Sequence, residues 1–389
     1  MVELHEDIPI TDRRLGFGLS IKQQPVMLAL VAALGALFFL AVAGLSRAYH
    51  EQREALGERW FSRGVADLNG KRYDSAMTEF RSALLYSRDN FDYQLNLAEA
   101  LIGLNRTGEA YSYLVNLWEE QPENGVVNLE LARIAAQRTQ TEQAQRYYHN
   151  AIYAVWPGNQ EEKRRETRLE LIEYLLSINV RAQAQAELIA LQENLGDDPA
   201  QQRRVGELFL QAHDYEHALA AYRLSLKVER HNEAALAGAG RAAMELGQYP
   251  LAERYLQAAV AENPNDAQSA ERLKTTQLVL RMDPFRHGIS ADERDRAVME
   301  AFATAGQRLS SCATPKGPNV TTTGQPNLAD SWAKMKPTVS QQELRRNPDL
   351  AEQAMDLVFE IERQTSANCG TPGEADQALL LISQSHEGN

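Results

Sequence analysis

Two histidines in the middle of the chain have a spacing that occurs in one class of metal enzyme. The segment His213-Asp-Tyr-Glu-His217 fits the H-x-x-E-H form of the inverted zinc peptidases. That chemistry needs both imidazoles on one face of a single helix and a third zinc ligand from elsewhere in the fold. The pattern therefore poses one question, whether His213 and His217 share a helix.

The two cysteines of the chain suggest a different kind of chemistry. Cys312 and Cys369 each follow a stretch with helical apolar spacing, so a disulfide could fasten two helix ends together. Closing a loop of this size would stabilise the fold by about 4 kcal/mol in the chain-entropy model. The alternative is two unpaired buried thiols, which a reducing compartment would favour. No C-x-x-C pair occurs, which argues against thiol exchange, rubredoxin-like metal binding and haem attachment.

Other catalytic and nucleotide-binding motifs are absent from the sequence. It contains no Gly-rich phosphate loop, no G-x-S-x-G elbow and no lysine motif typical of nucleotide enzymes. Its 40 basic and 53 acidic residues give a net charge of -13, which repels nucleic acid phosphates. We therefore expect no cofactor, no metal, no nucleic acid partner and no small-molecule substrate, and we expect that the protein is not an enzyme.

The elements that would position these residues follow a fixed period. Six alanines recur at intervals of 34, 34, 40, 34 and 34 residues: Ala76, Ala110, Ala144, Ala184, Ala218 and Ala252. Four residues after each alanine lies a bulky apolar or aromatic side chain, such as Phe80, Tyr222 or Leu256. A period near this length indicates a helical repeat array.

The best-formed unit carries a recognisable set of residues, Leu236, Gly240, Gly247, Tyr249, Ala252, Ala259 and Pro264. At these positions the chain resembles the tetratricopeptide-repeat family, whose unit is two antiparallel helices joined by a tight turn. The resemblance implies an all-α solenoid of about six units, because neither helix of a unit can bury its apolar stripe alone. In this phase His213 would lie in the turn of the fifth unit and His217 on the helix after it. We therefore expect no zinc site.

Turn residues and one irregular unit complete the repeat pattern. Gly70, Asn105 and Gly247 fall where the turn within a unit should be. The fourth unit carries about six extra residues in segment 158–167, which we interpret as a lengthened connection before a divergent repeat. Segment 266–282 is predicted as one more helix that covers the last unit.

The resemblance also implies a binding surface. In the family, first-helix residues between the packing positions line a concave groove that takes an extended peptide or a partner helix. By phase the candidate partner-binding residues are Asp92, Leu95, Glu99, Leu129, Arg133, Arg203, Glu207, Arg241 and Met244. Mixed charges with leucines and a methionine suit a polypeptide better than a small polyanion. The alternative is that these residues are ordinary solvated surface.

A membrane span is predicted before the repeats. Val26 to Leu45 is an unbroken apolar run, and about 20 helical residues at about 1.5 Å each cover the hydrocarbon core of a bilayer. We expect an amino-terminal tail over 1–24 and a transmembrane helix over 25–46. Basic residues flank the run on both sides, so their bias does not set the orientation. A first apolar segment commonly exports the chain after it, and the cysteines suit export, so we expect a bacterial inner-membrane protein with its solenoid outside the cytoplasm.

Two alternatives concern the same segment. Ala41-Val42-Ala43 has the form of a cleavage site, so the run could belong to a signal peptide that is removed. The protein would then be a soluble periplasmic peptide-binding or chaperone-like protein. With a reversed anchor, the solenoid would instead lie in the cytosol, as in membrane-anchored import receptors, with reduced cysteines.

The carboxy-terminal region loses the repeat period. We predict the solenoid with its capping helix over 47–282 and a small helical domain over 283–389. Capping patterns predict helix starts at three pairs, Ser290 with Glu293, Ser340 with Glu343 and Thr371 with Glu374, and another helix begins after Asn347-Pro348. Segment 314–327, rich in Pro, Gly and Thr, is predicted as an extended loop.

Together these patterns predict a membrane-anchored scaffold or assembly factor. We expect its partners to be other proteins or peptides at a membrane complex, bound through the concave face without catalysis.

Overall fold

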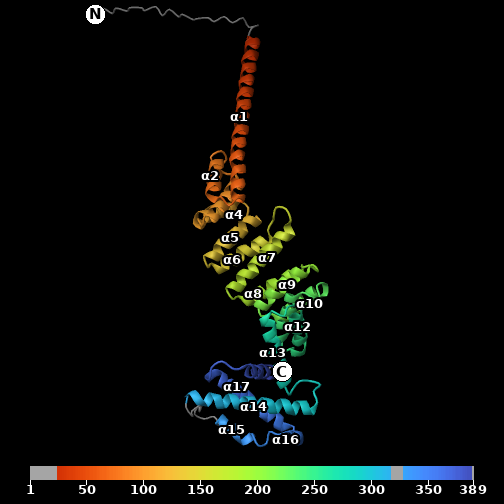
Figure 1. The fold of residues 1–389 in the computed structure, drawn as a ribbon. Helices are drawn as coiled ribbons and strands as arrows, with labels where there is room; N and C mark the ends of the chain where they lie inside the picture. Colours follow the sequence, from red (N-terminus) through yellow and green to blue (C-terminus); the bar gives the residue numbers. More distant parts are fainter. Residues whose placement is uncertain (1–23, 317–326, 388–389) are drawn as a thin grey trace, which may run out of the picture. The chain divides into compact units, whose positions relative to one another are not determined.

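The computed structural model describes residues 24–316 and 327–387, and Figure 1 shows their fold. In these residues the secondary structure is helical, apart from one isolated parallel bridge between Asn124 and Val155. The predicted all-α class is therefore confirmed. The chain divides into two compact units, unit 1 ending at Gln160 and unit 2 beginning at Glu161.

Unit 1 contains three helix pairs, the red to yellow part of Figure 1. Its helices are α1 (Gln24–Asn69), α2 (Tyr73–Leu84), α3 (Phe91–Gly103), α4 (Thr107–Glu120), α5 (Gly125–Gln137) and α6 (Thr141–Tyr153). Helices α3 and α5 begin at asparagine caps, where Asn90 and Asn124 each accept a hydrogen bond from a first-turn amide. Each first helix packs against the second helix that follows it.

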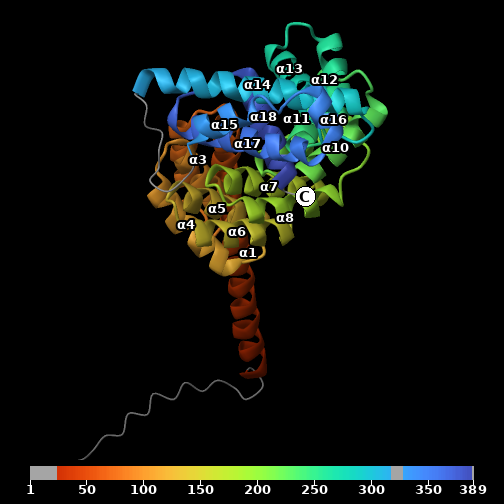
Figure 2. The same ribbon diagram turned by 90° about the horizontal axis from the view of Figure 1, so that it is seen from below.

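Unit 2 continues with helix pairs and then departs from them. Its repeat helices are α7 (Gln160–Ser177), α8 (Arg181–Gln192), α9 (Pro199–Gln211), α10 (Tyr215–Val228), α11 (Glu233–Glu245), α12 (Tyr249–Glu262) and α13 (Ala267–Met282). The remaining helices are α14 (Ala291–Lys316), α15 (Leu328–Met335), α16 (Gln341–Arg346), α17 (Asp349–Asn368) and α18 (Glu374–Glu387), drawn in blue in Figures 1 and 2.

Small residues let the helices of each pair approach closely. All six periodic alanines are fully buried. The aromatic residue that follows fills the space beside them, as Tyr222 does against Gly238, where an added Cβ would lie 2.2 Å from the Tyr222 ring. Phe80 contacts Gly64 in the same way. The alternation of small and large residues therefore sets the helix spacing.

Each helix pair turns through the same backbone motif. One residue per turn has a left-handed φ, between 57° and 68°: Lys71, Asn105, Thr139, Asn179, His213 and Gly247. These residues follow the 34, 34, 40, 34, 34 spacing of the alanines. In every turn this residue and its successor donate backbone hydrogen bonds of 2.8 to 3.2 Å to the end of the first helix, which is the Schellman arrangement.

Gly70, Asn105 and Gly247 lie in the turns within their units, as predicted, and in the first turn the left-handed residue is Lys71, next to Gly70. One detail of the predicted repeat pattern is wrong. The extra residues of the fourth repeat do not form a lengthened connection. They extend the first helix, since α7 begins at Gln160 and has 18 residues where α5 and α9 have 13.

Helix α1 continues from the apolar run into the first repeat without a break. It has 46 residues and ends at the first turn. Its segment Val26–Asn69 has a mean hydropathy of 2.8 over its most apolar window, and none of that window is buried by the described chain. The residues after Arg47 are therefore helical up to the first turn. A membrane anchor and a signal sequence both have this length and composition.

The last five helices share a core with the end of the repeat array. Val279 and Met282 of α13 lie in one buried cluster with Val298 of α14, Val358 of α17 and Leu379 of α18. This packing explains why α13 does not end the compact unit. The domain boundaries predicted after residues 46 and 282 remain predictions.

Three of the four helix starts predicted in this region are confirmed, two from capping pairs and one from Asn347-Pro348. Ser290, Ser340 and Asn347-Pro348 precede α14, α16 and α17 as expected. The fourth is wrong, because α18 begins at Glu374 and the Gly373 amide donates to Asp376 at 2.9 Å.

The segment between Cys312 of α14 and the start of α16 also differs from the prediction. Helix α14 runs to Lys316, so Cys312 lies within it, and the start of the predicted extended loop is helical. The rest of that loop, 317–326, lies outside the described residues. The short helix α15 was not predicted. Its Trp332 donates its indole N–H to the Phe302 carbonyl at 3.1 Å and covers Gly306 of α14.

Candidate binding surfaces on the first helices of the repeats

In unit 1 the predicted binding residues lie on α3 and α5, and we call them the unit 1 face. It consists of Asp92, Leu95, Glu99, Leu129 and Arg133, which are exposed or half-buried except for Leu95, at 8 % exposure. Arg133 forms an ion pair of 2.6 Å with Glu130. Burial raises the pKa of Glu99 to about 7, and the nearby Glu130 charge adds to the effect while Arg133 opposes it. Glu99 of α3 and Arg133 of α5 are therefore close enough for their charges to interact.

In unit 2 the predicted residues Arg203, Glu207, Arg241 and Met244 lie on α9 and α11, and we call them the unit 2 face. Tyr222, the packing aromatic of the fifth repeat, donates its hydroxyl to Glu207 at 3.0 Å. Burial and then the Glu207 charge raise the pKa of Tyr222, whereas Arg241 and Arg203 lower it. The hydroxyl of the core residue Tyr222 thus holds the Glu207 carboxylate in place. Arg203 and Arg241 lie close enough to act on the same hydroxyl.

Met244, at the end of α11, lines a cleft of about 470 Å³. The cleft is formed by α11, α13 and α18, and it is lined by Met244, Gln268, Glu271, Arg272, Thr275, Gln377, Leu380 and Leu381. At one end of α18, Lys274 of α13 forms an ion pair of 2.6 Å with Glu374. We call this site the α13–α18 cleft. Because a methionine and two leucines lie among polar side chains, the cleft suits a ligand that inserts an apolar side chain and has polar groups around it.

Sequence reasoning found one residue of the cleft and missed the others. Met244 came from the repeat phase, and α13 was predicted only as a cap. The apolar run Leu379–Ile382 signalled a helix in the right place. No local signal shows that this helix packs on α13, because the contact joins residues 100 positions apart.

The two histidines of the H-x-x-E-H segment lie on different elements, as predicted. His213 is the left-handed residue of the turn after α9, at φ 61°, and its Nδ1 lies 3.4 Å from Arg181. His217 lies on α10, with Nδ1 2.9 Å from the Asp214 carboxylate. The segment is therefore explained by the turn of the fifth repeat, where Asp214 also caps α10 by accepting the His217 amide.

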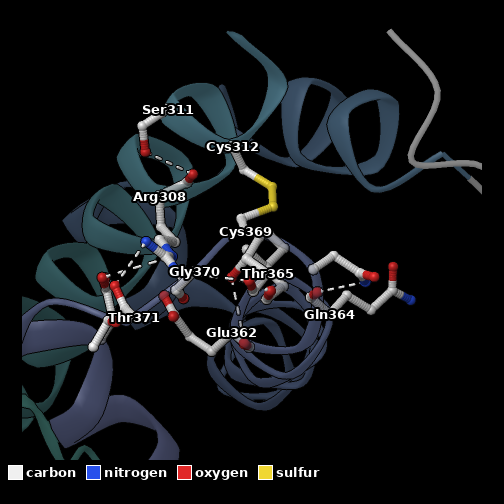
Figure 3. The surroundings of a disulfide bond; sticks show 12 residues. Arg308, Ser311, Cys312, Glu362, Gln364, Thr365, Cys369, Gly370 and Thr371 are labelled. Atoms are coloured by element: carbon white, nitrogen blue, oxygen red, sulfur yellow. Dashed lines mark hydrogen bonds and ion pairs between the residues drawn. A yellow bond between two sulfur atoms is a disulfide. The ribbon is translucent and has the colours of Figure 1, made fainter. Parts of the chain in front are cut away.

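Figure 3 shows the disulfide that joins Cys312 of α14 to Cys369 at the end of α17. The two Cα atoms are 5.4 Å apart, and the residues are 57 positions apart in the sequence. A loop of this length corresponds to about 4 kcal/mol in the chain-entropy model. One turn before Cys312, Arg308 donates to the Gly370 carbonyl at 2.8 Å. The α17–α18 connection is thus held by a covalent bond and by a guanidinium.

A buried carboxyl group lies under this connection. Glu362 of α17 is 0 % exposed, and within the described chain neither of its oxygens has a hydrogen-bond partner. Burial raises the pKa of Glu362 to about 8, the Asp376 charge adds to the rise, and Arg308 opposes it. We therefore expect Glu362 to be mostly protonated at neutral pH.

Comparison with known proteins identifies the repeat. The tetratricopeptide-repeat family model matches residues 209–275, which include the turns of the fifth and sixth repeats at His213 and Gly247. The chain carries tetratricopeptide repeats. A search of curated protein sequences gave no match.

Several solved tetratricopeptide structures are similar to the chain. One is YrrB, described as a TPR protein with an unusual peptide-binding site, at 14% identity over 49% of this chain and 95% of that chain, with a TM-score of 0.39. PilF of Pseudomonas aeruginosa is 16% identical over 57% and 97% of the two chains, with a TM-score of 0.39. Part of a TPR repeat-containing protein from Cytophaga hutchinsonii is 12% identical over 62% and 94%, with a TM-score of 0.45.

Proposed function

We propose that this tetratricopeptide protein is a membrane-anchored scaffold that binds other polypeptides through the first helices of its repeats and catalyses no reaction. The α13–α18 cleft is the observation that carries the proposal. It combines Met244, predicted to bind from the repeat phase, with Leu380 and Leu381 of a helix outside the repeats.

The chemistry of the cleft favours a polypeptide partner. Its volume of about 470 Å³ can accept one or two apolar side chains, and Glu271 and Arg272 supply charges of both signs at its edge. Methionine adapts to differently shaped apolar groups because its side chain is unbranched and polarizable. An extended segment or a helix that inserts an apolar anchor would bury these three side chains and keep polar contacts around them.

The apolar part of α1 supports the membrane anchor. Its 0% burial would expose some 20 apolar residues to water in a soluble protein, whereas a bilayer would cover them. An anchored array also raises the local concentration of partners in the same membrane. Mass spectrometry of the mature amino terminus tests this part of the proposal, since a start at Gly44 would show a cleaved signal peptide and a soluble protein.

A pair of matched variants tests the binding site. Thr275 lines the cleft, and its hydroxyl donates to the carbonyl four residues earlier on α13. Thr78 makes the same local hydrogen bond on α2, and it is exposed on a second helix. Thr275→Arg should block the cleft and reduce partner recovery from native membranes at least tenfold, by affinity purification with quantitative mass spectrometry. Thr78→Arg should leave recovery unchanged. Equal recovery with both variants, or no reproducible polypeptide partner of the unaltered protein, would contradict the proposal.

A further inference from the structure

A second cavity, of about 430 Å³, lies beside the connection between α13 and α14. It has no lining residue in common with the α13–α18 cleft. One part of its wall is the connection itself and the first turn of α14, which contribute Arg286 and Arg294. Another part is the first turn of α17, which contributes Asp349 and Glu352.

The connection that carries Arg286 is held in place by the preceding residue. The Phe285 amide donates to the Asp283 carboxylate at 2.9 Å. The Phe285 ring stacks on His386 of α18 with ring centroids 4.1 Å apart, and it also lies beside Phe359 of α17. Arg286 is therefore presented from an anchored segment.

The start of α14 fixes Arg294 in a similar way. Ser290 and Glu293 form a reciprocal capping box, in which the Ser290 amide donates to Glu293 at 2.9 Å and the Glu293 amide donates to the Ser290 hydroxyl. Arg294 directly follows this box. The Ser290 and Glu293 amides are thus already in use, and we consider the charged side chains as the groups that could hold a ligand.

Two arginines and two carboxylates line the wall without an ion pair between them. In the described part of the chain, the side chains of Arg286, Arg294, Asp349 and Glu352 form neither ion pairs nor hydrogen bonds. The two arginines are half-buried and the two carboxylates are exposed. The charge of Arg286 also acts on the carboxylates of Asp283 and Glu293. The Nε atoms of both arginines are also buried without a hydrogen-bond partner. An acceptor bound in the cavity would satisfy these two donors.

The signs of these charges decide the class of ligand. A simple anion would gain from the two arginines and lose from the two carboxylates, and a simple cation would do the reverse. A small molecule with both charges gains from all four. We propose that this cavity binds a free α-amino acid, with its carboxylate at Arg286 and Arg294 and its ammonium group at Asp349 and Glu352. Phe285 and Ile289 also line the cavity, and they would contact an apolar side chain of the amino acid.

Calorimetry on the full-length protein in detergent tests the proposal with three probes. L-leucine carries both charges, N-acetyl-L-leucine lacks the ammonium group, and L-leucine amide lacks the carboxylate. We expect L-leucine to bind at micromolar to millimolar concentration and each derivative to bind at least tenfold more weakly. Should L-leucine fail to bind in this range, or should either derivative bind as tightly as L-leucine, the assignment is wrong.

Two variants locate the binding on the cavity. Arg294→Gln should weaken L-leucine binding by tenfold or more, because it removes a charge that holds the carboxylate. Arg296→Gln is the matched control on the same helix, since Arg296 is exposed and its Nε donates to the Asp292 carbonyl. Loss of binding in the first variant alone supports the proposal. Equal binding in both variants would overturn it, and circular dichroism of each variant checks that α14 is still folded.

Discussion

Each repeat turn contains one residue with a left-handed backbone conformation, and in most turns this residue is not glycine. Five of the six repeat turns place a non-glycine residue at a positive φ, including the β-branched Thr139 at 57°. Such a backbone costs free energy for any residue with a Cβ, and most for a branched one. His213 occupies the same position, so the H-x-x-E-H pattern has a structural origin in the repeat.

Replacing Thr139 with glycine should stabilise the protein. Thr139 is exposed, so Thr139→Gly removes the backbone strain without opening a cavity, and we expect a gain of about 1 kcal/mol in the free energy of unfolding. Chemical denaturation monitored by circular dichroism measures it. Arg254→Gly, at an exposed position within α12, should instead lose about 1 kcal/mol. A loss in both variants would show that the turn carries no strain.

The buried Glu362 should make stability depend on pH. Its pKa is about 8 in the fold, against 4.5 for the usual side chain. Because the folded carboxyl keeps its proton where the unfolded one has lost it, stability is complete below about pH 4.5 and falls as the pH rises to about 8. Glu362→Gln should remove this fall and be more stable than the unaltered protein at pH 8.5, by on the order of 2 kcal/mol.

Denaturation at several pH values measures this effect. Asp356→Asn, at an exposed position of the same helix, is the control and should keep the pH dependence of the unaltered protein. If Glu362→Gln and the unaltered protein lose stability in parallel between pH 5 and pH 8, the carboxyl is not buried in its neutral form.

At the scale of elements, close helix contacts depend on glycines that face aromatic rings. Gly238 of α11 leaves the space that the Tyr222 ring fills, and an added Cβ would lie 2.2 Å from that ring. Gly238→Ala should therefore destabilise the protein by about 1 to 3 kcal/mol, because the ring cannot move without disturbing the core. Thermal unfolding followed by circular dichroism would show the change.

Gly108 of α4 provides the comparison, since an added Cβ there meets nothing within 4 Å. Gly108→Ala should be neutral or should stabilise by up to about 1 kcal/mol. Equal effects of the two substitutions would mean that helix propensity, and not packing, limits the repeat.

The sequence predicted the elements whose signals are local. The alanine period and the aromatic residue after each alanine located the helix pairs, and serine caps located α14 and α16. The fourth repeat was harder, because extra residues can lengthen either a loop or a helix, and segment 160–167 has charges that suit a solvated helix. The α13–α18 cleft could not be predicted, since it depends on tertiary contacts between segments without a shared period.

At the scale of the whole molecule, one apolar helix is joined to repeats that we propose bind polypeptides. Helix α1 contributes to both, because its last turns are the first helix of the first repeat. The described residues 24–69 therefore contain no break in the helix between the apolar run and the repeats. An anchored binding array would hold its partner at the membrane, which fits a scaffold or assembly factor better than a diffusing chaperone.

Site-specific photo-crosslinking in native membranes tests the central claim most directly. A photoreactive amino acid at position 244 would report on the α13–α18 cleft, and one at position 254 would report on an exposed part of α12. A membrane-anchored scaffold should give a discrete adduct with the same polypeptide in repeated experiments from position 244, in the membrane fraction, and none from position 254. A protein found only in the soluble fraction, or adducts that are the same from both positions, would contradict this function.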